Sequence, residues 1–204
     1  MIQDYFEFFS LPRKLVVDVP ALEKQFYVLS RKLHPDRFAA RPVAEQEAAL
    51  AESSLLNDAY RTLKEPVART QYLLTLEGVE LEEQSRAATD AARASGTQKK
   101  QIVPPELLEE VFELNMQLAE MRAAKEMGED EPELRRDLLT AKDAFDEKMV
   151  DTQAELEGLW ARWDAAFEAN NEDAKAGVRD AMVVLLNKRS YLRNLVRDVN
   201  AALE

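Results

Sequence analysis

The stretch Leu33–Phe38 reads Leu-His-Pro-Asp-Arg-Phe and lies between two segments with helical periodicity. The apolar residues before it recur at spacings of four, three and four, at Leu22, Phe26, Leu29 and Leu33. These spacings place the four side chains on one side of a helix. The residue before a proline is disfavoured in the α region, so this helix is predicted to end at His34.

The segments around this stretch predict a helical hairpin. Asp18 followed by Val19-Pro20 predicts the start of the first helix, through an N-cap and a proline in the first turn. A second pattern begins after Pro42 and runs to Leu63, with one side formed by Ala49, Ser53, Leu56, Ala59, Tyr60 and Leu63. Two such helices joined by a short loop favour an antiparallel pair. Pro66 then opens a shorter helix, for which Gly78 is the expected stop.

Three longer helical patterns occupy the C-terminal half. They cover Glu106–Met127, Glu133–Glu168 and Glu172–Leu203. Short breaks between amphipathic helices favour an antiparallel bundle. Residues 82–103 lack apolar periodicity and are interpreted as a partly disordered linker. The predicted fold class is therefore all-α, with an N-terminal hairpin domain at residues 1–76, a linker at 77–104 and a three-helix bundle at 105–204.

Composition excludes several functional classes. The 204 residues carry a formal charge of −12, with no cysteine and one histidine. The absence of cysteine excludes disulfide scaffolds, thiolate metal sites and thiol catalysis. The single histidine excludes a metal site with several histidine ligands. Net acidity argues against general nucleic-acid binding. No long apolar run or basic-then-apolar start occurs, so we expect a soluble protein without a membrane span or secretory signal.

The charge is unevenly distributed along the chain. Residues 1–76 hold 10 basic and 10 acidic side chains, whereas residues 77–204 hold 17 and 29. Between Ala21 and Arg41 the balance turns positive, and Lys24, Tyr27 and Arg31 lie opposite the apolar side of the first helix. This basic face is either an ordinary solvated surface or a docking surface for an acidic partner. The asymmetry predicts two regions with two kinds of partner.

The tripeptide His34-Pro35-Asp36 alone fits a helix stop followed by a turn, but its context is more specific. Together, Asp4-Tyr5-Phe6 through Leu11-Pro12, the loop His34–Phe38 and the segment Leu56–Leu63 resemble the J domain of DnaJ-type co-chaperones. The continuation Pro66–Leu74, with an acidic three-helix region after it, resembles the HscB family, the J-type co-chaperones of iron–sulfur cluster assembly.

The resemblance implies a first partner, a DnaK-class chaperone that is specialised as HscA in many bacteria. The loop and the basic helix face would dock on its ATP-bound form and stimulate ATP hydrolysis. The expected chaperone-binding residues are His34, Pro35, Asp36, Lys24, Tyr27, Arg31, Lys32 and Arg37. The chain has no phosphate-binding loop of the G-x-x-x-x-G-K-[ST] kind, so it is expected to be no enzyme itself but the activator of a partner ATPase.

The predicted helix Glu106–Met127 has two apolar stripes. The first, which a bundle core can absorb, comprises Leu107, Val111, Leu114, Leu118 and Met121. The second comprises Leu108, Phe112 and Met116, roughly 120–150° away around the helix. It either packs against the N-terminal domain or forms an exposed docking patch flanked by Glu109, Glu113 and Glu120.

The family resemblance implies that this second stripe, with an aromatic residue of the last helix, binds the cluster scaffold protein IscU. The expected scaffold-binding residues are Leu108, Phe112, Glu113, Met116, Glu120 and Tyr191. Met116 departs from the family, which has a more polar residue at that position.

Other functions fit less well. A di-iron bundle enzyme needs Glu-x-x-His pairs, and position 31, three residues before the single histidine, is Arg31. Trp160 and Trp163 are interpreted as core and boundary residues, and we expect no catalytic residue, metal or cofactor. A structural coiled coil is disfavoured because turns interrupt the stripes. A general J-type holdase for unfolded clients remains the alternative. The chain has neither a transit peptide nor an N-terminal cysteine pair, so we expect a bacterial cytoplasmic protein.

Overall fold

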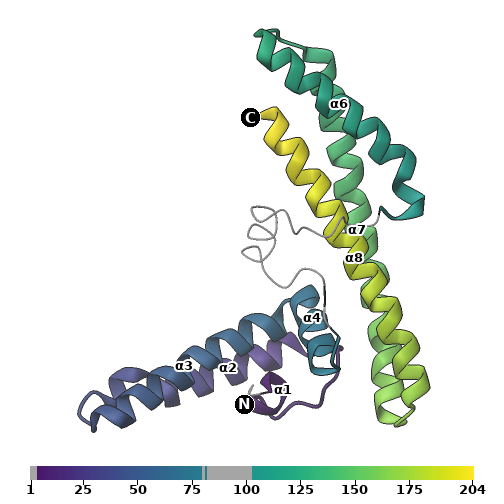
Figure 1. Cartoon of the computed structure of the whole chain (residues 1–204). Coiled ribbons are helices and arrows are strands. Elements are labelled where there is room, and N and C mark those ends of the chain that lie inside the picture. The colour runs from purple at the N-terminus through teal and green to yellow at the C-terminus, as the bar shows by residue number, and fades with distance from the viewer. Residues whose placement is uncertain (1–3, 80, 82–102) are drawn as a thin grey trace. The chain divides into compact units, whose positions relative to one another are not determined.

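The computed structural model describes residues 4–79, 81 and 103–204, and the elements in these ranges are helices (Figure 1). Except for Val103, the linker predicted at residues 82–103 lies outside the described residues. Contacts divide the chain into two compact units. The first unit comprises residues 1–80 and 157–180, and the second comprises residues 81–156 and 181–204. The last two helices of the chain contribute to both units, so neither unit is a single continuous segment of the sequence. The predicted boundaries at 76 and 104 stay a prediction.

The first unit begins with the predicted helical hairpin. Its elements are α1 (Tyr5–Phe8), α2 (Val19–Leu33), the 3₁₀ turn η1 (Pro35–Phe38), α3 (Val43–Lys64) and α4 (Pro66–Leu76). Asp18 caps α2, as predicted, and its side chain accepts a hydrogen bond from the backbone N–H of Ala21 over 3.0 Å. Gly78 has a φ of +79°, a left-handed conformation that suits glycine and ends α4.

Helices α2 and α3 pack side by side, as the apolar spacing predicts (Figure 1). The rings of Phe26 and Tyr60 stack with their centroids 4.2 Å apart, and the Tyr60 hydroxyl donates to Glu23 over 3.2 Å. The residues of the two predicted apolar sides that are fully buried are Leu22, Ala49, Leu56, Ala59 and Leu63. The antiparallel pair thereby places the segment between α2 and α3 at the tip of a hairpin.

Residues 157–180, from α7 (Pro132–Glu168) and α8 (Glu172–Leu203), complete the first unit. Trp163 is fully buried, and its indole N–H donates to the carbonyl of Arg13 over 3.2 Å. The two carboxylate oxygens of Asp164 accept from the backbone N–H groups of Leu15 at 2.7 Å and Val16 at 3.0 Å. Both tryptophans are buried, whereas core and boundary positions were predicted for them, and the backbone before α2 supplies several of the contacts.

A buried arginine joins four parts of this unit. Arg69 of α4 is only 2% exposed, and its guanidinium donates to the carbonyls of Leu15 at 3.0 Å and Leu63 at 2.6 Å. The same group lies 4.7 Å from the ring centroid of Trp160. Burial lowers the pKa of Arg69. The guanidinium therefore supplies donors to a carbonyl in the last turn of α3 and to a carbonyl of the segment before α2.

The second unit contains the predicted bundle. It holds a 3₁₀ turn, η2 (Pro105–Leu107), followed by α6 (Leu108–Met127) and by parts of α7 and α8. Helix α6 begins two residues after the predicted Glu106, because Pro105–Leu107 forms a 3₁₀ turn instead of a first α turn. Gly128, with a φ of +73°, ends α6 in a left-handed cap.

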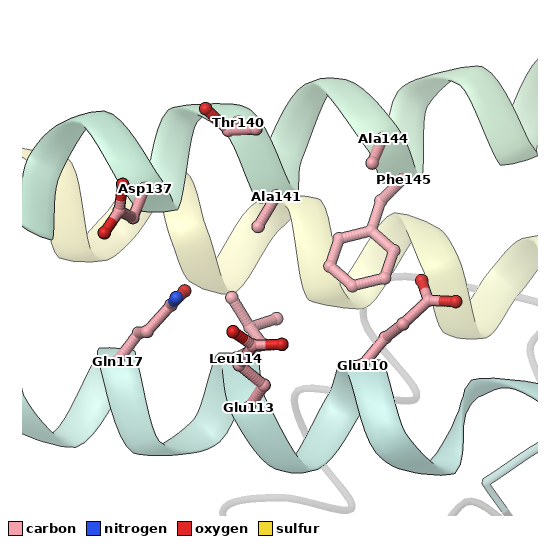
Figure 2. A pocket seen from close by; sticks show the side chains of 9 residues that line it. All are labelled: Glu110, Glu113, Leu114, Gln117, Asp137, Thr140, Ala141, Ala144 and Phe145. Carbon is pink, nitrogen blue, oxygen red and sulfur yellow. The ribbon is translucent and has the colours of Figure 1, made fainter.

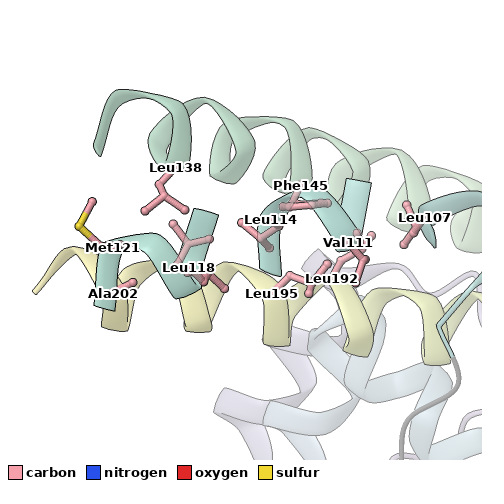
Figure 3. Packing of buried hydrophobic residues seen from close by; sticks show 11 residues of the cluster. Leu107, Val111, Leu114, Leu118, Met121, Leu138, Phe145, Leu192, Leu195 and Ala202 are labelled. Atoms are coloured by element: carbon pink, nitrogen blue, oxygen red, sulfur yellow. The ribbon is translucent and has the colours of Figure 1, made fainter. Parts of the chain in front are cut away.

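The core of this unit is a cluster of buried residues from all three helices (Figure 3). It includes the whole inner stripe of α6 and the adjoining Leu107, together with Leu138 and Phe145 of α7 and Leu192, Leu195, Val199 and Ala202 of α8. Ion pairs from Lys148 to Glu110 at 3.2 Å and from Lys188 to Glu106 at 3.3 Å flank the cluster. The three-helix bundle predicted from the apolar stripes is therefore confirmed, with α7 running opposite to α6 and α8 (Figure 3). In the described ranges, no helix has the length and apolar character needed to cross a bilayer.

Candidate functional site

The His34-Pro35-Asp36 segment forms an exposed turn at the tip of the hairpin. Helix α2 ends at Leu33, and the 3₁₀ turn η1 starts directly after His34. The Nδ1 atom of His34 accepts a hydrogen bond from the backbone N–H of Asp36 over 3.3 Å and lies 3.4 Å from the Asp36 carboxylate. In the neutral imidazole this leaves the proton on Nε2. The side chains of His34 and Asp36 are 55% and 88% exposed, so both present polar groups to the surroundings.

The basic face of α2 lies next to this turn. Lys24, Arg31 and Lys32 are exposed, and Tyr27 is 55% exposed. Arg37 of η1 donates from Nη1 to the carbonyl of Arg31 over 3.2 Å, which ties the turn to the last residues of α2. The eight predicted chaperone-binding residues thus lie on α2 and the turn that follows it.

Sequence reasoning missed one residue of this face. Val28 is 46% exposed, although it is apolar and follows Tyr27 directly. Its spacing of four from Lys24 and three from Arg31 is the signal that places it on the basic face. The face is therefore amphipathic, with an apolar centre between cationic side chains.

Helix α6 carries a second exposed surface, which we call the apolar patch and define as Leu108, Phe112 and Met116. These side chains are 55%, 68% and 51% exposed. The inner stripe of the same helix is buried. The prediction that the bundle core absorbs this first stripe is therefore confirmed. Glu109, Glu113 and Glu120 are exposed beside the patch. The arrangement is an apolar surface with a carboxylate border, which is typical of protein-docking sites.

Tyr191 of α8, the remaining predicted scaffold-binding residue, is only partly exposed. It packs against the core cluster, whose members include Leu107, the neighbour of Leu108 in sequence. Burial raises the pKa of the Tyr191 hydroxyl, and the nearby charge of Asp198 raises it further. Tyr191 therefore contributes to the core of the bundle as well as to its surface.

The chemistry of these surfaces is that of binding. Within the part of the chain that the structure describes, no three histidine or acidic side chains gather in a way that suits a metal ion. The polar groups of the His34–Asp36 turn are exposed. Both surfaces are suited to contact with other proteins, one cationic and the other apolar with acidic edges.

Comparison with known proteins bears on the fold of the whole chain. No protein-family model matches the sequence. The chaperone HscB from Vibrio cholerae matches with 25% sequence identity and a TM-score of 0.59, over 98% of this chain and 96% of that one. The human co-chaperone protein HscB matches with 24% identity and a TM-score of 0.59, over 98% of this chain and 82% of that one. Over nearly its whole length the chain therefore has the fold of the HscB co-chaperones, and the match supports the J-type co-chaperone role that its sequence motifs indicate.

Proposed function

We propose that this protein is a co-chaperone that links an iron–sulfur cluster scaffold of the IscU type to a DnaK-class chaperone resembling HscA. The scaffold binds to the apolar patch and to its acidic border. The chaperone binds to the His34–Asp36 turn and the basic face of α2, and its ATP hydrolysis is stimulated, which promotes cluster transfer. The observation that carries the proposal is that one chain presents an exposed His-Pro-Asp turn and an exposed apolar patch.

Electrostatics support the proposed binding of the chaperone. A cationic surface steers and orients an acidic partner surface, and hydrogen-bonding groups in a proline-containing turn lose little entropy on binding. Asp36 is almost fully exposed, so its carboxylate is free to accept hydrogen bonds from a partner in exchange for bonds to water.

The substitution Asp36→Asn tests the proposed binding of the chaperone. It keeps the shape of the side chain and removes the charge, so helical content measured by circular dichroism stays unchanged. Stimulation of the partner chaperone's ATPase is expected to be lost. Glu52→Gln, which neutralises an exposed carboxylate on α3, serves as the control and stimulates normally. Normal stimulation by Asp36→Asn would refute the assignment.

Substitutions in the apolar patch test the proposed binding of the scaffold. Truncation of a large apolar hot-spot residue reduces binding by about 1–3 kcal/mol. We therefore expect Leu108→Ala and Phe112→Ala each to weaken binding of the cognate scaffold in isothermal titration calorimetry. Val150→Ala on α7 removes an apolar side chain that is 69% exposed in the same unit, and it is expected to bind with wild-type affinity. If both patch variants keep their fold and bind the scaffold with wild-type affinity, the assignment of the apolar patch as the scaffold-binding site is refuted.

A competition experiment separates this function from that of a general holdase. A dedicated scaffold carrier forms a 1:1 complex with the folded scaffold, and denatured proteins do not displace the scaffold. A holdase binds many unfolded chains, and an excess of denatured protein then competes for the site.

A further inference from the structure

Methionine carries all the sulfur of this chain, since the sequence has six methionines and no cysteine. Among the described residues, the methionines differ sharply in exposure. Met121 and Met182 are 5% and 0% exposed, whereas Met116 is 51% and Met127 is 73% exposed. A peroxide in solution therefore reaches the side chains of Met116 and Met127 before those of the two buried residues.

The two exposed methionines differ in what surrounds them. Met116 belongs to the apolar patch and lies one helical turn after Phe112. Met127 is the last residue of α6 and lies about 16 Å further along the helix axis. A partner that covers the apolar patch therefore buries Met116, whereas Met127 lies beyond the patch.

The neighbouring helix α7 does not cover Met116. A groove between α6 and α7 is lined on α6 by residues that include Glu113 and Gln117, but Met116 is not one of them (Figure 2). Figure 2 shows the Gln117 amide directed from α6 toward α7. The groove is thus on another flank of α6, and the side chain of Met116 stays open to solvent.

The side chains around Met116 on α6 offer no hydrogen-bond donor to an added oxygen atom. One turn away along the helix lie Phe112, Glu113, Ala119 and Glu120, and an ionised carboxylate accepts hydrogen bonds without donating them. In the free protein, water supplies the donors, because Met116 is exposed. Once a partner covers the patch, an oxygen on this sulfur is buried without a donor from these four side chains, which is unfavourable.

We propose that Met116 is a modification site at which a peroxide converts the thioether to a sulfoxide, and that this change lowers the affinity of the apolar patch for the folded scaffold protein. Hydrogen peroxide transfers one oxygen atom to a sulfur lone pair, so that the O–O bond breaks, an S–O bond forms and water leaves. The sulfur is oxidised by two electrons, and the peroxide is reduced by two. This inference rests on the proposed function and adds regulation by oxidation to it.

The effect is expected to be confined to one of the two binding surfaces. Between residues 2 and 115 the sequence contains no methionine, so the His34–Asp36 turn and the basic face of α2 are not modified in this way. The oxidised chain is therefore expected to stimulate the chaperone's ATPase normally when the scaffold is absent, although it binds the scaffold more weakly.

Calorimetry with the full chain tests the inference. The chain alone is treated with hydrogen peroxide, catalase removes the excess before the scaffold is added, and peptide mass spectrometry locates the added oxygen. We expect oxidation at Met116 and Met127, unchanged helical content and an affinity for the scaffold about tenfold lower. Methionine sulfoxide reductases, one for each sulfoxide epimer, are expected to restore the affinity with a dithiol, which becomes a disulfide as the oxygen leaves in water.

Three variants locate the effect. Met116→Leu has an apolar side chain of similar volume that a peroxide does not oxidise, so its affinities before and after treatment are expected to be equal. Met127→Leu is the matched control on the same helix, because it loses the other exposed methionine and is expected to remain sensitive to peroxide. Met116→Gln places a polar group of similar length in the patch and is expected to bind weakly without treatment.

The outcomes separate this inference from the proposed function. If the untreated wild-type chain does not bind the scaffold, the proposed function is wrong and the inference falls with it. If the untreated chain binds, but complete oxidation of Met116 changes the affinity by less than about twofold, the inference alone is overturned. It is also overturned if peroxide weakens Met116→Leu as much as the wild type, or if Met116 stays unmodified when Met127 is fully oxidised.

Discussion

The indole N–H of Trp160 in α7 donates a hydrogen bond to the hydroxyl of Thr70 in α4 over 3.1 Å, and the two residues are 90 positions apart in the chain. The Thr70 hydroxyl donates in turn to the carbonyl of Pro66 over 3.0 Å. Both side chains are buried. A chain of two hydrogen bonds thus connects the first turn of α4 to α7 within the first unit.

Thr70→Val is expected to destabilise this unit. Valine has nearly the same shape but leaves the buried indole N–H without an acceptor, which reduces the free energy of unfolding by about 1–3 kcal/mol. Urea denaturation followed by tryptophan fluorescence measures the change. Thr75→Val on the same helix is the control, because the exposed Thr75 hydroxyl makes the same kind of bond, to the carbonyl of Gln71. Equal stability of Thr70→Val and the wild type would contradict the role of the bond.

Arg69→Lys is expected to be a damaging substitution, although it keeps the positive charge. A lysine ammonium lacks the planar group that donates to Leu15 and Leu63 while lying on the Trp160 ring. Leaving these carbonyls without a donor reduces the free energy of unfolding by about 2–4 kcal/mol. Thermal unfolding measures the loss, and Arg61→Lys, at an exposed position of α3, is the control. A melting temperature within one degree of the wild type would show that the guanidinium geometry is unimportant.

The neighbours Leu107 and Leu108 form a matched pair for separating stability from binding. Leu107 is buried in the core cluster, so Leu107→Ala is expected to reduce the free energy of unfolding by about 2–5 kcal/mol. Leu108 is exposed, so Leu108→Ala is expected to change it by less than about 0.5 kcal/mol. Chemical denaturation of the two variants provides the measurement. A large loss of stability in Leu108→Ala would mean that the patch is structural.

Alkaline pH is expected to destabilise the protein. Burial raises the pKa values of the Tyr72 and Tyr191 hydroxyls in the folded state. The unfolded chain releases these protons near pH 10, whereas the folded protein retains them to higher pH. Because the folded state then binds more protons, the free energy of unfolding is unaffected below about pH 9 and falls as the pH rises above about 10.

Urea titrations between pH 8 and pH 11 test this dependence. The double variant Tyr72→Phe/Tyr191→Phe should show a smaller fall in unfolding free energy above pH 10. Tyr27→Phe, at an exposed position, should retain the wild-type slope. A slope in the double variant as steep as in the wild type would assign the effect to other groups.

Local signals in the sequence predicted much of the fold. Asp18 with Pro20, Pro66 and Gly78 mark helix ends through their own backbone preferences, and the structure places the ends there. The two stripes of α6 follow from helical periodicity alone, and the burial of one and the exposure of the other agree with it.

Long-range relationships were not predictable in this way. The partners of Trp160 and Arg69 lie in distant parts of the sequence, and periodicity shows only that a residue is buried, without naming its neighbour. The groove between α6 and α7, lined by residues that include Gln117 and Asp137, was also missed, because these residues become neighbours only when the two helices pack with a particular offset. The functional surfaces were proposed from motifs, and their binding roles stay predictions.

The discontinuous first unit has a consequence for protein synthesis. Residues 1–80 leave the ribosome first, but Trp160, Trp163 and Asp164, which complete their packing, are translated only after residue 156. The N-terminal unit therefore cannot reach its final state while it is being made, contrary to the usual order in which early domains fold first. In a nascent chain interrupted before residue 157, the backbone N–H groups of Leu15 and Val16 lack the Asp164 carboxylate that accepts their hydrogen bonds in the folded unit.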